Sequence, residues 1–177
     1  MKVPLLDLQP QTDFFREQII QEISEVVDST CYILGSKVSG LERKIAEYSG
    51  AAAAVGVSSG TDALLASLMA LELRPGDKIL TTPYTFFATM GSILRVGAVP
   101  VFADAEPRSL NLDPIKTAEI LERDAAGQRK IKAILPVHLF GQCADMSAFM
   151  KLSRQYGGPV IEDAAQAIGA EYPCVGG

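Results

Sequence analysis

The chain is poor in the side chains that build transition-metal sites and disulfide frameworks. It has one histidine and three cysteines in 177 residues. The histidine is not accompanied by cysteines or carboxylates clustered at metal-ligand spacing, which argues against a transition-metal site. The cysteines, Cys31, Cys143 and Cys174, are scattered along the chain. This distribution favours a reducing cytoplasm over a disulfide-stabilised secreted domain.

Long apolar runs and an excess of positive charge are also missing. The longest apolar runs are far shorter than a membrane-spanning helix needs. The first residues turn acidic and contain proline too early for a secretory signal. The formal net charge of −5 argues against a general nucleic-acid or anionic-membrane surface. We therefore expect a cytoplasmic protein that binds neither nucleic acid nor membrane, which does not exclude a local phosphate site.

Apolar periodicity predicts an α/β fold. After two amphipathic helices near residues 12–28 and 38–48, short apolar runs alternate with helical patterns. The predicted strands are 52–57, 78–82, 99–103, 131–137 and 159–161. Helices of ten or more residues between strands imply crossover connections. We expect a mainly parallel sheet with helices on both faces, in which the carboxyl ends of the strands share one edge.

The stretch GPVIEDAAQAIGA, residues 158–170, places an acidic residue at that edge. Its apolar run ends at Ile161 and is followed by Glu162 and Asp163. Ligands of open α/β sheets bind outside the carboxyl ends of the strands. A carboxylate at this position can hold a cationic ring nitrogen, a ribose hydroxyl or a metal ion. It can equally be an acidic residue that simply ends a strand.

A second motif at the same edge is the turn SSGTD, residues 58–62. Exposed amides at a helix N-terminus bind phosphate well, and Gly60 lets the backbone approach a ligand. The turn can also serve only as a helix cap, with Ser59 and Asp62 as the capping pair. It lacks the lysine of a P-loop and the spacing of a dinucleotide fingerprint, so nucleotide binding is weakly supported.

Aromatic residues and the single histidine follow two other predicted strands. Tyr84, Phe86 and Phe87 lie just beyond residue 82, where one ring could stack on a planar cofactor, although aromatics at a helix start are more often core. His138 follows residue 137 and could be a general base or a satisfied polar group beneath the sheet edge. The residues alone leave both alternatives open.

Together the segments resemble the sugar aminotransferase family DegT/DnrJ/EryC1/StrS, which is pyridoxal phosphate (PLP)-dependent and of fold type I. The resemblance covers nearly the whole chain, and its ordered segments are VPLLDLQPQ, YILGSKVSGLE, VGVSSGTDAL, TTPYTFFATMGSILRVGAVPVFAD, ILPVHLFGQCADM and VIEDAAQAIGA. It implies the large domain of that fold, here incomplete. It also implies a reaction that moves an amino group, usually from glutamate, to a keto group on a nucleotide-linked sugar.

The resemblance also implies roles for individual residues. Asp163 matches the partner of the pyridine nitrogen, which supports the protonated ring that acts as an electron sink. Phe86 matches the ring-stacking position, and Gln166 matches the residue near the phenolic oxygen of PLP. Ser59, Gly60 and Thr61 fall in the phosphate-contacting turn. One departure is Ile168, which stands where the family commonly has histidine.

The family's Schiff-base lysine is expected beyond Gly177, together with the small domain. We therefore expect residues 1–50 to be the N-terminal helical segment and residues 51–177 the truncated PLP-binding domain. We expect this chain alone to be inactive and the full-length enzyme to be a homodimer. Two alternatives stay open: a PLP-dependent sugar dehydratase of the same family, with histidine in place of the lysine, and a non-catalytic PLP-binding or regulatory module.

Overall fold

The computed structural model describes residues 3–127 and 130–173 and divides into two compact units, residues 1–56 and 57–177. The first unit contains the helices α1 (Gln9–Ser29) and α2 (Ser36–Ser49). Helix α1 has proline in its first turn and ends at Thr30, whose φ of 53° is left-handed. Both helices predicted for this part of the chain are confirmed, α1 with slightly wider bounds. Neither α1 nor α2 contains a buried residue.

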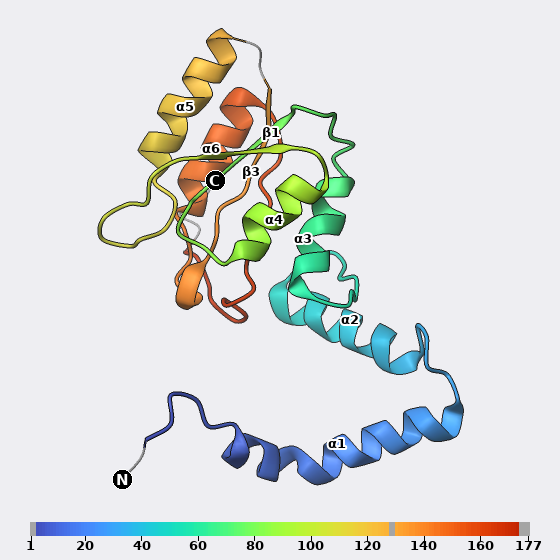
Figure 1. Ribbon diagram of the computed structural model, residues 1–177. Coiled ribbons are helices and arrows are strands. Elements are labelled where there is room, and N and C mark those ends of the chain that lie inside the picture. Colours follow the sequence, from blue (N-terminus) through green and yellow to red (C-terminus); the bar gives the residue numbers. More distant parts are fainter. Residues whose placement is uncertain (1–2, 128–129, 174–177) are drawn as a thin grey trace. The chain divides into compact units, whose positions relative to one another are not determined.

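The second unit is built on a small parallel sheet (Figure 1). Its strands are β1 (Lys78–Thr81), β2 (Val99–Phe102) and β3 (Ile131–Ile134), in the order β2-β1-β3. The register pairs Leu80 with Val101 and with Ile134. The helices are α3 (Gly60–Met69), α4 (Phe87–Arg95), α5 (Pro114–Ala126) and α6 (Met146–Tyr156), with a 3-10 turn, η1, at Leu139–Gly141.

Helices cover both faces of this sheet because successive side chains along a strand point to opposite faces. Ile79 packs with Leu64, Leu68 and Ile93 of α3 and α4. Leu80, the next residue, packs with Leu121 and Phe149 of α5 and α6. Figure 1 shows α5 and α6 on one side of the strands and α3 and α4 on the other. The predicted α/β fold with a parallel sheet and helices on both faces is confirmed.

Two predicted strands differ from the structure. Residues 52–57 form no strand, and no β-bridge between described residues includes them. The N–H of Gly56 instead donates to the Glu42 carboxylate over 2.7 Å. Residues 159–161 make isolated parallel bridges, which join Val160 to Ile134 and, just beyond, Asp163 to Val137. The last strand therefore lies where it was predicted but is reduced to two bridges.

The described helices include none that is both long and apolar enough to cross a membrane.

Candidate functional site

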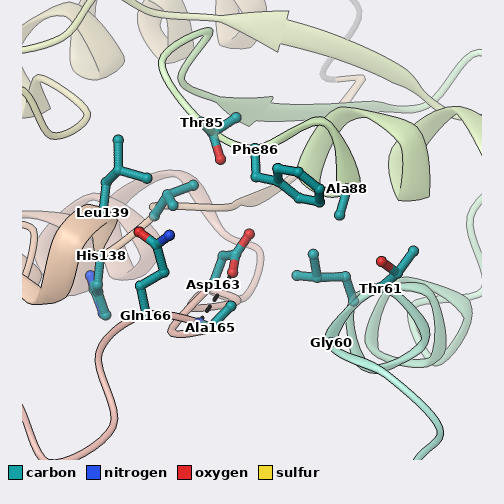
Figure 2. Close-up of a pocket in the computed structure, with 12 residues that line it drawn as sticks. Gly60, Thr61, Thr85, Phe86, Ala88, His138, Leu139, Asp163, Ala165 and Gln166 are labelled. Carbon is teal, nitrogen blue, oxygen red and sulfur yellow. Dashed lines mark hydrogen bonds between the residues drawn. The ribbon is translucent and has the colours of Figure 1, made fainter. Parts of the chain in front are cut away.

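A cavity lies at the carboxyl edge of the sheet, where the sequence predicted that strand ends converge. Its volume is about 230 Å³, many times the roughly 30 Å³ that one water molecule occupies in the liquid. It is lined by Gly60, Thr61, Leu64, Thr85, Phe86, Ala88, Val137, His138, Leu139, Asp163, Ala165 and Gln166. Figure 2 shows the Asp163 carboxylate between Gln166 on one side and the Gly60–Thr61 turn on the other, with the Phe86 ring above it.

Five of the six predicted site residues line this cavity, and Ser59 does not. Ser59 is the N-cap of α3, where its hydroxyl accepts the N–H of Asp62 over 3.1 Å. The capping pair expected from the sequence is therefore present. Tyr84 and Asp104, which also follow predicted strands, are exposed and lie outside the cavity lining.

The turn that begins α3 offers backbone donors to the cavity. No described residue accepts a hydrogen bond from the N–H of Gly60 or Thr61. A Cβ atom placed on Gly60 would meet no atom within 4 Å, so the backbone is open to a ligand. Hydrogen bonds from Ser58 and then Ser59 hold the pKa of Asp62 below its usual value. The unbonded N–H groups of Gly60 and Thr61 at the helix N-terminus suit an anionic ligand.

Asp163 is held firmly at the centre of the lining. Its N–H donates to Pro136 and its carbonyl accepts from His138, each over 3.0 Å. Its side chain is 8% exposed. The Oδ2 atom accepts a 2.7 Å hydrogen bond from the Thr89 hydroxyl. Among the described residues, the Oδ1 atom receives only a long 3.4 Å contact from the N–H of Ala165, so it retains capacity for a ligand.

Phe86 and Gln166 supply an aromatic face and a polar group. Phe86 is the N-cap residue of α4 and is 72% exposed, so its ring is free to cover a planar ligand. The Gln166 Oε1 atom accepts the N–H of Phe140 over 2.9 Å. Phe140 has a φ of 55° in the 3-10 turn. With its oxygen engaged, Gln166 has its NH₂ group available to donate.

Both ring nitrogens of His138 have hydrogen-bond partners, as expected for the satisfied polar group that was one of the two alternatives left open by the sequence. The ring is 4% exposed. Its Nδ1 accepts the N–H of Ala144 over 3.1 Å, and its Nε2 lies 2.8 Å from Glu162 Oε2. Because Nδ1 accepts a hydrogen bond, Nε2 is the nitrogen that donates to the carboxylate. That hydrogen bond lowers the pKa of Glu162, against the opposing effect of burial.

The sequence analysis missed the threonine that bonds to Asp163. Thr89 is fully buried, and its hydroxyl also lies 2.8 Å from that of Thr85. The available signal was the spacing of Thr85 and Thr89, one helical turn apart, directly after a strand that ends at the site. Among the described residues, no group of three or more histidine, cysteine, aspartate or glutamate side chains could hold a metal ion.

The donor set of the cavity fits PLP. A phosphate is an anion that suits the α3 turn, and a flat pyridine ring suits the exposed face of Phe86. A protonated ring nitrogen suits the free Oδ1 of a buried carboxylate, and a phenolic oxygen suits the NH₂ of Gln166. The lining residues are therefore complementary to the phosphate, the ring face, the ring nitrogen and the phenolic oxygen of the cofactor.

Comparison with known proteins gives consistent matches over nearly the whole chain. The model of the DegT/DnrJ/EryC1/StrS aminotransferase family matches residues 14–175. A pleiotropic regulatory protein of Geobacillus stearothermophilus is 47% identical over 99% of this chain and 46% of its own length. The UDP-2-acetamido-2-deoxy-3-oxo-D-glucuronate aminotransferase of Pseudomonas aeruginosa is 42% identical over 96% of this chain and 46% of its own length.

The fold is also similar to that of a solved structure from the same family. The crystal structure of a DegT DnrJ EryC1 StrS aminotransferase from Brucella abortus aligns with a TM-score of 0.90 and 35% identity. It covers 95% of this chain and 45% of that one. The chain thus spans about half the length of the relatives it matches. Because the family model covers almost all of its residues, the chain belongs to the DegT/DnrJ/EryC1/StrS aminotransferase family.

Proposed function

We propose that this chain is the PLP-cradling part of an aminotransferase that moves an amino group from glutamate to a keto group on a nucleotide-linked sugar. The observation that carries the proposal is the cavity, in which a buried carboxylate, an exposed aromatic face and a helix N-terminus converge. The nucleotide-sugar substrate class rests on relatives such as the aminotransferase of Pseudomonas aeruginosa.

The lining residues have distinct roles in this proposal. The N–H groups of Gly60 and Thr61 hold the phosphate, and Ser59 supports them by capping α3. Phe86 covers one face of the ring, Asp163 pairs with the ring nitrogen, and Gln166 donates to the phenolic oxygen. When bound, PLP supplies an electron sink that stabilises negative charge on the substrate carbon. The chain's own contribution is to hold the ring flat and to keep its nitrogen protonated.

The test is amino transfer by the protein at its natural full length. Protein loaded with PLP is mixed with glutamate and a UDP- or dTDP-linked 3-keto sugar, and 2-oxoglutarate and amino sugar are measured. We expect the two products in equal amounts. We also propose that the isolated chain of 177 residues does not turn over, because no lysine is among the described residues that line the cavity. Amino transfer by this chain alone would overturn that second proposal.

Two alternatives have separate outcomes in the same assay. A dehydratase would consume the keto sugar without forming an amino sugar in equal amount. A non-catalytic module would bind PLP but turn over neither substrate. The name of the Geobacillus stearothermophilus relative, a regulatory protein, is the observation that favours the non-catalytic module.

We also propose the assembly and the domain limits. Residues 1–50 would belong to the N-terminal helical segment and residues 51–177 to the PLP-binding domain. A homodimer of the full-length enzyme is supported by α1, whose apolar side chains are exposed and need a covering surface; these are Phe14, Phe15, Ile19, Ile20, Ile23 and Val27. Light scattering on the natural protein tests this, and a monomer would contradict it.

A cytoplasmic location is supported by the free thiols of Cys31 and Cys143; Cys174 lies outside the described residues.

A further inference from the structure

Thr89 connects the two walls of the cavity. It lies in the first turn of α4 and is fully buried. Its N–H donates to the carbonyl of Phe86 over 3.2 Å, and its hydroxyl bonds to Asp163 Oδ2 over 2.7 Å. Thr89 therefore links the backbone of Phe86 to the carboxylate of Asp163, which lies 74 residues after Thr89 in the sequence.

The direction of these hydrogen bonds follows from the chemistry of the groups. An ionised carboxylate can only accept, so the Thr89 hydroxyl gives its one proton to Asp163. The oxygen of Thr89 then accepts from the Thr85 hydroxyl, which lies 2.8 Å away. The two threonines thus form a one-way relay of donors that ends on Oδ2.

The relay leaves one carboxylate oxygen for a ligand. Oδ2 is occupied by a short, well-buried hydrogen bond, whereas Oδ1 has only the 3.4 Å contact from Ala165. A carboxylate that is held at one oxygen cannot rotate freely about its last side-chain bond. Hydrogen bonds to charged groups contribute more than neutral ones, so this bond is strong enough to select one orientation.

We propose that Thr89 is a positioning residue that fixes the orientation of Asp163 toward the cationic ring nitrogen of a pyridine-type cofactor. This inference rests on the proposed function and extends it, because neither the sequence motifs nor the resemblance assigned Thr89 a role. The proposal predicts that loss of the Thr89 hydroxyl weakens the interaction of Asp163 with the ring nitrogen and leaves the other contacts of the cofactor unchanged.

The experiment compares two ligands that differ at one atom. Pyridoxamine 5′-phosphate and its 1-deaza analogue, in which carbon replaces the ring nitrogen, are titrated into the natural full-length apoprotein by fluorescence. The wild type should prefer pyridoxamine phosphate. Thr89→Val, which keeps the shape and removes the hydroxyl, should lower this preference roughly tenfold, the scale of one charge-assisted hydrogen bond. Thr89→Ser, which keeps the hydroxyl, should restore most of it.

A matched control comes from α5. Thr117 is also fully buried, but its hydroxyl has no hydrogen-bond partner among the described residues. Thr117→Val should leave the preference unchanged. If Thr89→Val does not fold, Thr85→Val takes its place, because it removes the donor behind Thr89 and should lower the preference by a smaller factor.

The outcomes separate this inference from the proposed function. Wild-type protein that binds pyridoxamine phosphate with a preference that Thr89→Val does not change would overturn the role of Thr89 alone. So would a variant that weakens both ligands equally, because that is what a merely structural role predicts. Wild-type protein that binds neither ligand would overturn the proposed function and this inference with it.

Discussion

Asp163 is the residue on which the proposed chemistry of the site depends. It is buried, anchored through its backbone to Pro136 and His138 just beyond β3, and bonded at one oxygen to Thr89. Its surroundings therefore fix its position independently of any ligand. A neutral side chain of the same shape would keep these surroundings but lose the charge that we propose to pair with the ring nitrogen.

The first prediction replaces that charge. Asp163→Asn in the full-length enzyme should keep PLP, because the α3 turn, Phe86 and Gln166 are unchanged. The rate of amino transfer should fall by roughly 10²–10³-fold, the cost of removing one preorganised electrostatic group. Steady-state rates and PLP absorbance measure both effects. Asp104→Asn, at the same sheet edge but outside the lining, is the matched control; near-normal turnover in Asp163→Asn would remove the assigned role.

The second prediction concerns Glu162, whose pKa is lowered by the hydrogen bond from His138. A lowered pKa in the folded state means stability that is present above the unfolded-state value of about 4.3 and is lost as the pH falls through the folded-state value. Glu162→Gln should therefore reduce the free energy of unfolding near neutral pH, by about 1 kcal/mol at most because the carboxylate is half exposed.

Urea unfolding of wild type and Glu162→Gln at stepped pH checks this sign. The difference between the two proteins should shrink towards zero in acid, where both side chains are neutral. A difference that grows on acidification would show that the carboxylate does not stabilise the folded state through His138.

Sequence analysis identified cavity-lining residues correctly where a residue follows the end of a predicted strand. Gly60, Phe86, Asp163 and Gln166 lie at turns beyond apolar runs, and the structure brings them to one cavity; their proposed roles remain predictions. Thr89 gave no comparable signal, because a buried threonine inside a helix is ordinary. Only the close approach of α4 to the Asp163 segment reveals its contact.

At the scale of single elements, α3 shows how a cap and a ligand site share one turn. The Ser59 hydroxyl accepts the N–H of Asp62, while the N–H groups of Gly60 and Thr61 have no acceptor among the described residues. Sequence reasoning found this cap because serine followed by aspartate three residues later is a local pattern. It placed Ser59 among the cofactor contacts as well, and the structure places it outside the cavity lining.

The third prediction tests the cap. Ser59→Ala should lower the free energy of unfolding by about 1 kcal/mol, the usual cost of losing an N-cap side chain. Ser67→Ala is the matched control, since the Ser67 hydroxyl lies within the same helix and bonds only to the carbonyl of Ala63. Chemical denaturation of both variants gives the comparison. Equal stability of the two variants would contradict a capping role for Ser59.

The fourth prediction concerns the close approach that brings the last segment to β3. Gly158 has a φ of 100°, and a Cβ there would lie 2.6 Å from the carbonyl oxygen of Lys132. Gly158→Ala should destabilise the protein through both backbone strain and this clash. Gly76→Ala, at a φ of 87° with nothing within 4 Å, carries the strain alone at about 1–2 kcal/mol.

Unfolding measurements on both glycine variants isolate the clash. Gly158→Ala should be less stable than Gly76→Ala by roughly 1–3 kcal/mol, the usual cost of overpacking. Variants of equal stability would mean that the approach of residue 158 to β3 is looser than the structure shows.

Strand prediction shows what a local pattern lacks. Three of the five predicted strands form, and residues 159–161 pair only through a bridge at Val160, followed by a second bridge at Asp163. The run at 52–57 has an equally apolar pattern but finds no partner among the described residues. A strand is a property of a pair of segments, because its N–H and C=O groups must meet a neighbour. Apolar composition alone therefore could not decide this element.

At the scale of the whole molecule, the fold class followed from the alternation of strands and helices, and the cavity lies at the predicted edge. The sequence segments that carry the family resemblance extend over both units, and the chain corresponds to about half of each relative. The exposed apolar side chains of α1 are consistent with a surface that other parts of the enzyme cover.

The most direct test of the proposal that the protein is a PLP-dependent aminotransferase is the intact mass of the protein from its natural source after incubation with PLP and borohydride reduction. We expect a mass above that of 177 residues and one covalent cofactor adduct, which peptide mapping places on a lysine beyond Gly177. A longer protein without an adduct would instead favour the dehydratase. A mass equal to these 177 residues with no adduct would contradict the account, and catalysis would then be withdrawn from this chain.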